Sequence, residues 1–331
     1  MSMRIALDVM GGDNAPAAPV LGGVEALDQL EAEFELLLVG DTEAIERELD
    51  GRDVDRDRLR IIAASETIEM DEAPVEAVRR KRDSSICRGI ELQARGEADA
   101  FVSAGSTGAV LAASMLSLGT LPGLDRAGLG ALLPTAGPHP TLLIDVGANA
   151  DCRSQDLERF AHLGHVYVQA VEGRPNPRVG LLNMGGEAGK GDRLSQETYR
   201  LLERGRLNFA GNVEGHDILS GDYDVVVCGG FAGNIVLKFY ESVADHLARR
   251  VSLSAAGSAA LIDLTRVCDV LDYAAQGGAP LLGVDGVTIV CHGDSPPRAI
   301  RNAVRVAVTA VENDMVERLK REFSGLAEAK A

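Results

Sequence analysis

Small, polar, glycine-rich loops are the parts of this sequence best suited to chemistry. They span residues 8–13, 103–108, 145–149 and 183–192, and each directly follows an apolar segment of strand length. Glycine lets a backbone approach a ligand closely, and the free N–H groups at a helix start attract anions. In an open parallel sheet, ligands bind beside the carboxyl ends of the strands. We therefore expect these loops to form the substrate site.

The segment from Ser103 to Gly108, with the sequence SAGSTG, is the clearest candidate for an anion site. It ends a predicted strand and begins a predicted helix, so its hydroxyl and N–H groups would surround one point at the positive end of the helix dipole. The alternative is an N-capped helix without a ligand, since Ser and Thr are common caps. No Walker-type lysine follows, and no GxGxxG pattern follows the first strand, which argues against a nucleotide site.

Two further side chains could take part in catalysis. Lys190 lies in the glycine-rich segment 185–192, which we expect to be a flexible loop from which a cation reaches into the cleft. An exposed loop lysine without a special role is the alternative. Asn234 follows the very apolar segment Val225–Val227 and a glycine-rich turn. Its amide could donate to a developing oxyanion, or it could simply cap a helix.

Apolar segments with the length and composition of buried strands alternate with helical patterns along the chain. The predicted strands are Arg4–Asp8, Glu35–Val39, Arg60–Ala63, Ala100–Ser103, Thr141–Asp145, Arg178–Asn183, Leu207–Gly211, Tyr223–Cys228 and Gly286–Cys291. This alternation predicts a three-layer α/β/α sandwich around a doubly wound, largely parallel sheet of Rossmann-like type.

The length and hydrophobicity of the chain are sufficient for a large folded core. Its 331 residues are 46% hydrophobic and could form one large domain or two lobes; no linker divides them, so we assign residues 1–331 to a single domain. Residues 235–276 predict a helical hairpin, and Gly277–Pro280 a break after it. The uncharged window 100–124 is too rich in glycine and polar residues for a membrane span, so we expect a strand, a tight loop and a buried helix there.

The strongly acidic balance restricts the partners. A formal net charge of -17 argues against nucleic acid and against unassisted binding to anionic membranes. An acidic partner would need a local basic patch. The candidates are the run Arg79, Arg80, Lys81 and Arg82, and the helix face that carries Arg298, Arg301 and Arg305. Either could instead be an ordinary solvated helix face.

Cysteines and histidines form no recognisable metal or hydrolase motif. The cysteines at 87, 152, 228, 268 and 291 lack CxxC spacing, so we expect neither disulfides nor a metal, and no cofactor is signalled. GxSxG and HExxH patterns are absent. His292 lies at an expected sheet edge, where we favour an anchoring role over a general base. The N-terminus lacks a signal-peptide pattern, and a reducing cytoplasm fits best.

Motifs in a fixed order along the chain carry a resemblance to a known family. They are RIALDVMGGDNAP from Arg4, MDEAPVEAVRRKRDSS from Met70, SAGSTGA from Ser103, LIDVGANADC from Leu143, NPRVGLLNMG from Asn176, NFAGNVEGHDI from Asn208, GFAGNIVLK from Gly230 and YAAQGGAPLLGVDG from Tyr273. With these motifs the chain resembles the PlsX family, the fatty acyl-[acyl carrier protein]:phosphate acyltransferases, from Arg4 to about Val304.

The resemblance implies reversible transfer of a long acyl chain from acyl carrier protein to inorganic phosphate, on a phosphotransacetylase-like fold, by a homodimer without a metal. The acyl phosphate would pass to a membrane glycerol-3-phosphate acyltransferase for phospholipid synthesis. Peripheral membrane contact is expected at the hairpin tip, residues 251–262. A thiolate leaving group needs little general-acid help, so positioning and oxyanion stabilisation are the main tasks of such an enzyme.

Matching motif by motif assigns roles to individual residues. The family's KGN-type lysine falls on Lys190 and its GFxGN asparagine on Asn234, which implies that Lys190 holds phosphate and Asn234 stabilises the oxyanion. We predict carrier-protein docking at Arg79–Arg82. The predicted phosphate-binding and substrate-binding residues are Asp8, Gly11, Gly12, Asp13, Ser103, Gly105, Ser106, Thr107, Gly108, Asp145, Asn149 and Gly233.

The sequence also departs from the family pattern. Gly229 stands where the family usually has Asp, and the segments 186–194 and 292–296 differ locally. A short-chain acyl-coenzyme A phosphotransacylase is the nearest alternative enzyme. A non-catalytic scaffold that binds acyl carrier protein at the membrane is the alternative of a different class.

Overall fold

The computed structural model describes residues 3–254 and 276–330 of the chain. The backbone packs as two compact units. Unit 1 contains residues 1–127, 169–174 and 277–331, and unit 2 contains residues 128–168 and 175–276. The assignment of the whole chain to a single functional domain remains a prediction.

Unit 1 is built on a mostly parallel sheet. Its strands are β1 (Met3–Asp8), β2 (Phe34–Gly40), β3 (Leu59–Ala63), β4 (Ala100–Ser103), β10 (Ala279–Leu282) and β11 (Val287–Val290), in the order β3-β2-β1-β4-β11-β10. In the register of the central strands, Ile5 pairs with Leu36 on one side and Ala100 on the other. Only β10 runs antiparallel to its neighbour β11 within this unit. Consecutive buried side chains along β2 explain why it forms a central strand rather than a half-exposed one.

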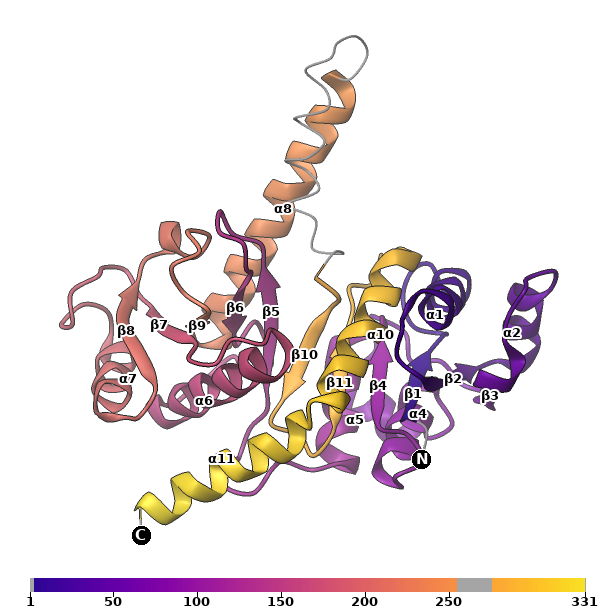
Figure 1. Ribbon diagram of the computed structural model, residues 1–331, viewed down its shortest axis with the longest axis horizontal. Helices are drawn as coiled ribbons and strands as arrows, with labels where there is room; N and C mark the ends of the chain where they lie inside the picture. The colour runs from indigo at the N-terminus through magenta and orange to yellow at the C-terminus, as the bar shows by residue number, and fades with distance from the viewer. Residues whose placement is uncertain (1–2, 255–275, 331) are drawn as a thin grey trace. The chain divides into compact units, whose positions relative to one another are not determined.

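Two groups of helices cover the sheet of unit 1 (Figure 1). Helices α1 (Ala17–Gln29) and α10 (Pro297–Glu312) pack against each other, and α3 (Pro74–Arg80), α4 (Ser85–Ala94) and α5 (Thr107–Ser117) form the second group. Both α10 and α4 contact β1 and β4 although the groups do not pack together, which places them on opposite faces. The short helix α2 (Thr42–Leu49), the 3-10 turn η1 (Arg56–Arg58) and the C-terminal α11 (Met315–Lys330) complete the unit.

Unit 2 is also built on mostly parallel strands. Its strands are β5 (Gly128–Leu133), β6 (Thr141–Ile144), β7 (Arg178–Leu182), β8 (Asn208–Val213) and β9 (Val225–Val227), in the order β5-β6-β9-β7-β8. All pairs are parallel except β5 with β6. The helices are α6 (Ser154–Val171), whose end belongs to unit 1, α7 (Arg193–Arg204) and α8 (Gly230–Ser254), with the 3-10 turn η2 (Gly215–Asp217). Figure 1 shows α8 extending well beyond the strands of its unit.

The predicted fold class is confirmed, and every strand predicted from the sequence is present. The sequence analysis missed β5 and β10. β5 directly follows a glycine- and proline-containing turn, and β10 contains Pro280 next to two glycines, so local composition indicates a loop at both places. Tertiary pairing with β6 and β11 overrides that preference.

The segments considered for membrane contact can also be compared with the structure. The uncharged window 100–124 forms β4, a tight loop and the helix α5, as predicted. Within residues 3–254 and 276–330, no helix is both long enough and apolar enough to cross a membrane. The first arm of the predicted hairpin is α8; its second arm lies outside the described residues.

Candidate functional site

The loop after β1 is shaped by the buried carboxylate of Asp8. One oxygen accepts backbone N–H groups from Met10 at 3.0 Å and Gly11 at 3.1 Å, and the other accepts the Ser103 hydroxyl at 2.7 Å. Burial raises the pKa of Asp8 above its ordinary value, while these donors act in the opposite direction. The Asp8 side chain is fully buried and organises the loop, a role that the sequence analysis did not predict. Direct contact of Asp8 with substrate stays a prediction.

The Ser103–Gly108 segment does join β4 to the start of α5, as predicted. Its hydroxyl groups are mostly occupied by the protein itself. The Ser106 hydroxyl caps α5 by accepting the N–H of Ala109 at 3.4 Å, and Ser103 is completely buried. Thr107 at the first position of the helix is exposed. The helix start and Thr107 are therefore the parts of this loop that remain accessible to an anion.

The loop after β11 lies against the loop after β1, a neighbour that the sequence did not reveal. The N–H of Asp13 donates to the carbonyl of Gly293 at 2.7 Å, and the Asn14 amide donates to the carbonyl of Asp294 at 3.0 Å. His292 Nδ1 lies 2.6 Å from a carboxylate oxygen of Asp294. The strand-end loops of β1, β4 and β11 thus form one group at the same edge of the unit 1 sheet.

In unit 2, Asp145 repeats the arrangement of Asp8. Its carboxylate accepts the N–H groups of Gly147 at 3.1 Å, Ala148 at 2.9 Å and Asn149 at 2.8 Å, together with the Asn149 side-chain amide at 2.9 Å. Burial raises the pKa of Asp145, although the hydrogen bonds favour its charged form. The carboxylate is buried and fixes the loop that follows β6. Asp145 and Asn149 therefore act on the loop's shape, and their direct contact with substrate stays a prediction.

Helix α8 begins directly over that loop. At Gly233 an added methyl group would overlap the carbonyl oxygen of Asp145 and lie 2.8 Å from the sulfur of Cys228, so only glycine lets the two backbones approach so closely. Cys228 itself donates to the same carbonyl at 3.3 Å, and burial raises the pKa of its thiol. These contacts fix the first turn of α8 against the end of β6.

Asn234 occupies the fifth position of α8, which excludes the helix-cap interpretation. The residue is exposed, and its side chain has no hydrogen-bond partner in the described part of the chain. Its Oδ1 would lie 3.3 Å from a methyl group at Gly147, so the amide is positioned beside the loop that Asp145 organises. An asparagine amide that lies beside this loop without a hydrogen-bond partner among the described residues is suited to hydrogen bonding with a ligand.

The lysine loop after β7 differs from the flexible segment that the sequence predicted. The N–H of Lys190 donates to the carbonyl of Glu187 at 3.0 Å, and the carbonyl of Lys190 accepts the amide of Asn183 at 3.1 Å. The Lys190 side chain is 52% exposed and its Nζ lies 3.9 Å from a carboxylate oxygen of Glu187. The backbone is thus fixed while the ammonium group is only weakly paired.

Two of the four cations predicted to dock a carrier protein share one carboxylate. Arg80 and Lys81 both pair with Glu72, and Lys81 also donates to the carbonyl of Thr67 at 2.6 Å. Arg79 and Arg82 are exposed, and neither has an ion pair or hydrogen bond within the described part of the chain. In the second candidate patch, Arg301 donates to Gln29 at 2.7 Å.

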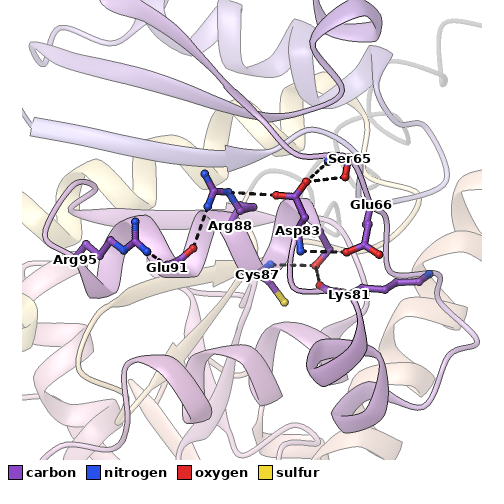
Figure 2. A network of polar contacts seen from close by, with 9 residues as sticks. Ser65, Glu66, Lys81, Asp83, Cys87, Arg88, Glu91 and Arg95 are labelled. Atoms are coloured by element: carbon purple, nitrogen blue, oxygen red, sulfur yellow. Dashed lines mark hydrogen bonds and ion pairs between the residues drawn. The ribbon is translucent and has the colours of Figure 1, made fainter.

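The junction that carries these cations is held by a polar network (Figure 2). Asp83 accepts the Ser65 hydroxyl at 2.6 Å and lies 3.7 Å from the guanidinium of Arg88, which in turn pairs with Glu91 at 3.2 Å. The Ser65 hydroxyl is the main cause that holds the pKa of Asp83 below its usual value. The network anchors the turn between α3 and α4.

The predicted site residues therefore fall into two groups, one in each unit. Unit 1 brings together the loops that contain Asp8, Gly11, Gly12, Asp13 and Ser103–Gly108. Unit 2 brings Asp145 and Asn149 together with Gly233 and Asn234. Lys190 lies in the same unit, on the loop after β7.

The structure is similar to solved phosphotransacylases. It matches EutD phosphotransacetylase from Staphylococcus aureus with a TM-score of 0.62 and 17% sequence identity over 94% of each chain. It also matches a branched-chain phosphotransacylase from Enterococcus faecalis V583 with a TM-score of 0.60 and 14% identity, over 93% of this chain and 99% of that chain. The α/β fold is therefore the fold of phosphotransacylases.

Sequence comparison gives the family. The profile of the family described as "Fatty acid synthesis protein" matches residues 3–318. The chain is 47% identical over 330 residues to the "Phosphate acyltransferase" of Desulfitobacterium hafniense (strain DSM 10664 / DCB-2), covering 97% of this chain and 98% of that protein. It is 46% identical to the "Phosphate acyltransferase" of Heliobacterium modesticaldum, covering 98% and 99% respectively. The chain belongs to this fatty acid synthesis (PlsX) family, and it is an acyltransferase that transfers acyl groups to phosphate.

Proposed function

We propose that this enzyme transfers a long-chain fatty acyl group from acyl carrier protein to inorganic phosphate. The observation that carries the proposal is the near full-length identity to phosphate acyltransferases within a family described by fatty acid synthesis, where acyl chains are carried as thioesters. The product is an acyl phosphate for phospholipid synthesis, handed to a membrane glycerol-3-phosphate acyltransferase. The reaction is reversible because the thioester and the acyl phosphate are both activated acyl donors.

The proposed chemistry is direct attack on the thioester. A phosphate oxygen adds to the acyl carbon, the carbon–sulfur bond breaks, and the proton carried by hydrogen phosphate ends on the released thiol. Lys190 neutralises the phosphate charge with its weakly paired ammonium group. Asn234 donates its unoccupied amide to the oxyanion that forms on the thioester carbonyl. No side chain has to act as a strong base, since phosphate is largely ionised near neutral pH and the thiolate leaves readily.

The unit 1 loops are assigned the binding of a further anionic group of the substrates. The start of α5 offers free backbone N–H groups and the exposed Thr107 hydroxyl. The buried hydrogen bond between Ser103 and Asp8 fixes the conformation of this loop. Glycine is needed at position 11 because a side chain there would lie 2.6 Å from the backbone nitrogen and 2.7 Å from the Cα of Gly105.

Carrier-protein docking is assigned to Arg79 and Arg82 rather than to the whole basic run. Both are exposed and unpaired within the described part of the chain, whereas Arg80 and Lys81 are committed to Glu72. An acidic carrier protein would meet two available guanidinium groups on a rigid helix junction. The enzyme's own net charge of -17 makes such a local patch necessary.

The helix α8 is assigned to a homodimer contact. It exposes an apolar stripe with a spacing of four residues, formed by Phe231, Ile235, Phe239, Val243 and Leu247, of which Phe239 is 71% exposed. A stripe of this kind on a projecting helix is suited to pairing with the same stripe of a second copy. Peripheral membrane contact stays a proposal from the sequence, because the side chains of its predicted tip lie outside the described residues.

The proposal is tested by measuring acyl phosphate formation from phosphate and matched acyl donors. The donors are palmitoyl-acyl carrier protein, palmitoyl-coenzyme A and acetyl-coenzyme A. We expect the highest kcat/KM with palmitoyl-acyl carrier protein. Activity confined to acetyl-coenzyme A would instead establish a short-chain phosphotransacylase, and equal activity with both palmitoyl donors would contradict carrier-protein recognition.

A further inference from the structure

The loop that presents Lys190 is held by side-chain amides from three separate elements of unit 2. Asn183 at the end of β7 donates to the carbonyl of Lys190 at 3.1 Å. Asn212 in β8 donates to the carbonyl of Glu187 at 2.8 Å. Gln196 in α7 donates to the carbonyls of Gly189 at 3.0 Å and Gly191 at 3.1 Å.

Each donor is itself fixed by regular structure. The N–H of Asn183 donates to the carbonyl of Val213 at 2.8 Å, so this residue continues the β7–β8 pairing. Asn212 is 7% exposed, and its Oδ1 is buried without a hydrogen-bond partner in the structure. A buried amide with an unsatisfied oxygen is costly, so packing alone gives no reason for asparagine at this position. Its donor to the loop supplies one.

The end of the loop is fixed in the same region. Asp192 caps α7 by accepting the N–H and the hydroxyl of Ser195, both at 2.8 Å. Gly191 has φ +87, and a methyl group there would lie 2.8 Å from the Cβ of Ser195. Glycine is therefore required directly after Lys190, both by the backbone conformation and by the lack of space.

The contrast with the lysine side chain is informative. Carbonyls of the loop on both sides of Lys190 accept amide donors. Among the residues that the structure describes, the ammonium group has only a 3.9 Å contact with Glu187, whose side chain is 74% exposed. A rigid backbone limits the positions that a flexible lysine side chain can sample, and it does so without pairing the ammonium group with a carboxylate. This arrangement suits a cation that must meet phosphate at a defined point.

We infer that Asn183, Gln196 and Asn212 are positioning residues for acyl transfer to phosphate, acting by fixing the backbone of the Lys190 loop. The inference rests on the proposed role of Lys190 in binding phosphate. It predicts that loss of a single amide lowers the use of phosphate while the rest of the fold and the acyl-donor site are unaffected. A purely structural role predicts a lower unfolding temperature with unchanged kinetics of the folded enzyme.

The test compares Gln196→Ala with Arg200→Ala, an exposed position one turn further along α7 that serves as the matched control. Alanine is a good helix former, so both variants should fold. For Gln196→Ala we expect kcat/KM for phosphate to fall by between about tenfold and a hundredfold, the usual effect of misplacing a catalytic group by about 1 Å. KM for the acyl donor and the unfolding temperature should match those of Arg200→Ala.

A second readout is independent of activity. Trypsin cleaves after lysine. The amides of Asn183 and Gln196 hold the carbonyls of Lys190 and Gly191, the two residues joined by the bond that trypsin would cleave. We expect faster cleavage at this bond in Gln196→Ala and in Asn183→Ser than in Arg200→Ala. Equal cleavage and equal kcat/KM for phosphate in Gln196→Ala and the control would overturn the inference.

The variant Lys190→Ala separates this inference from the proposed function. If Lys190→Ala is strongly impaired and Gln196→Ala is not, the positioning inference is wrong and the role of Lys190 stands. If Lys190→Ala keeps wild-type kcat/KM for phosphate, the role of Lys190 and the catalytic part of the inference both fail, and the trypsin comparison still decides whether the amides fix the loop.

Discussion

The close approach of α8 to the end of β6 predicts a large effect of a small substitution, Gly233→Ala. The added methyl group would overlap the carbonyl oxygen of Asp145 and lie 2.8 Å from the Cys228 sulfur and 2.9 Å from the Asp145 carbonyl carbon. Normal contact between such atoms begins at about 3.5–4.0 Å, so the first turn of α8 must move by at least about 1 Å. The Asp145 atoms belong to the backbone and the Cys228 thiol is buried, so the backbone has to yield.

Two consequences have different sizes. Forcing a methyl group into a packed site costs about 1–3 kcal/mol of unfolding free energy. Asn234 is the next residue, and a displacement of about 1 Å for a group that contacts the reacting atoms costs about a hundredfold in rate. We therefore expect kcat to fall by about two orders of magnitude in Gly233→Ala, well beyond what a modest loss of stability would cause in a protein that remains folded at the assay temperature.

The assay measures acyl phosphate formation together with urea unfolding of the same preparations. Gly215→Ala is the matched control, because Gly215 also lies after a strand of unit 2, at the 3-10 turn that follows β8, but a methyl group there meets nothing within 4 Å. The control should behave like the wild type in both measurements. Wild-type kcat in a folded Gly233→Ala variant would refute the role assigned to the Asp145–Gly233 contact and to Asn234.

Other predictions concern single contacts. Asp192→Ala should cost about 1 kcal/mol at pH 7, the usual effect of losing an N-cap. Backbone hydrogen bonding from Ser195 lowers the pKa of Asp192 below 3.8, so the stability that the cap contributes is present at neutral pH and fades as pH falls below 3.8. Urea unfolding of the wild type and Asp192→Ala at neutral pH and below 3.8 checks this. A difference in unfolding free energy that does not change with pH would contradict it. Gly229→Asp should fold and raise stability by a few tenths of a kcal/mol, because an added Cβ meets only the Cys152 sulfur at 3.9 Å and the residue directly precedes α8 as an N-cap. Loss of activity in this variant would show that this chain has adapted to glycine. Charge reversal at Arg79 and Arg82 should raise KM for acyl carrier protein by about tenfold with little change in KM for phosphate, and equal changes in both constants would exclude docking at these residues.

The sequence alone was sufficient for the fold class and for the family. Apolar runs such as Val225–Val227, alternating with helical patterns, require strands buried on both faces and therefore an α/β architecture. Glycine-rich loops after those strands mark the sheet edge where ligands bind, and their order carries the family resemblance. These properties are local, so a one-dimensional pattern can report them.

What the side chains do within those loops was decided by tertiary contacts. Asp8 and Asp145 are carboxylates at the ends of strands, where ligand-binding residues are expected. The fold buries both, and their hydrogen bonds shape the loops that follow. Arg80 and Lys81 extend a basic run in the sequence, but both pair with Glu72. Asn234 could have capped a helix until α8 proved to begin four residues earlier. Partners brought together from distant positions set burial, pairing and helix start, because the free energy of a polar group depends on its surroundings and not on its neighbours in the chain.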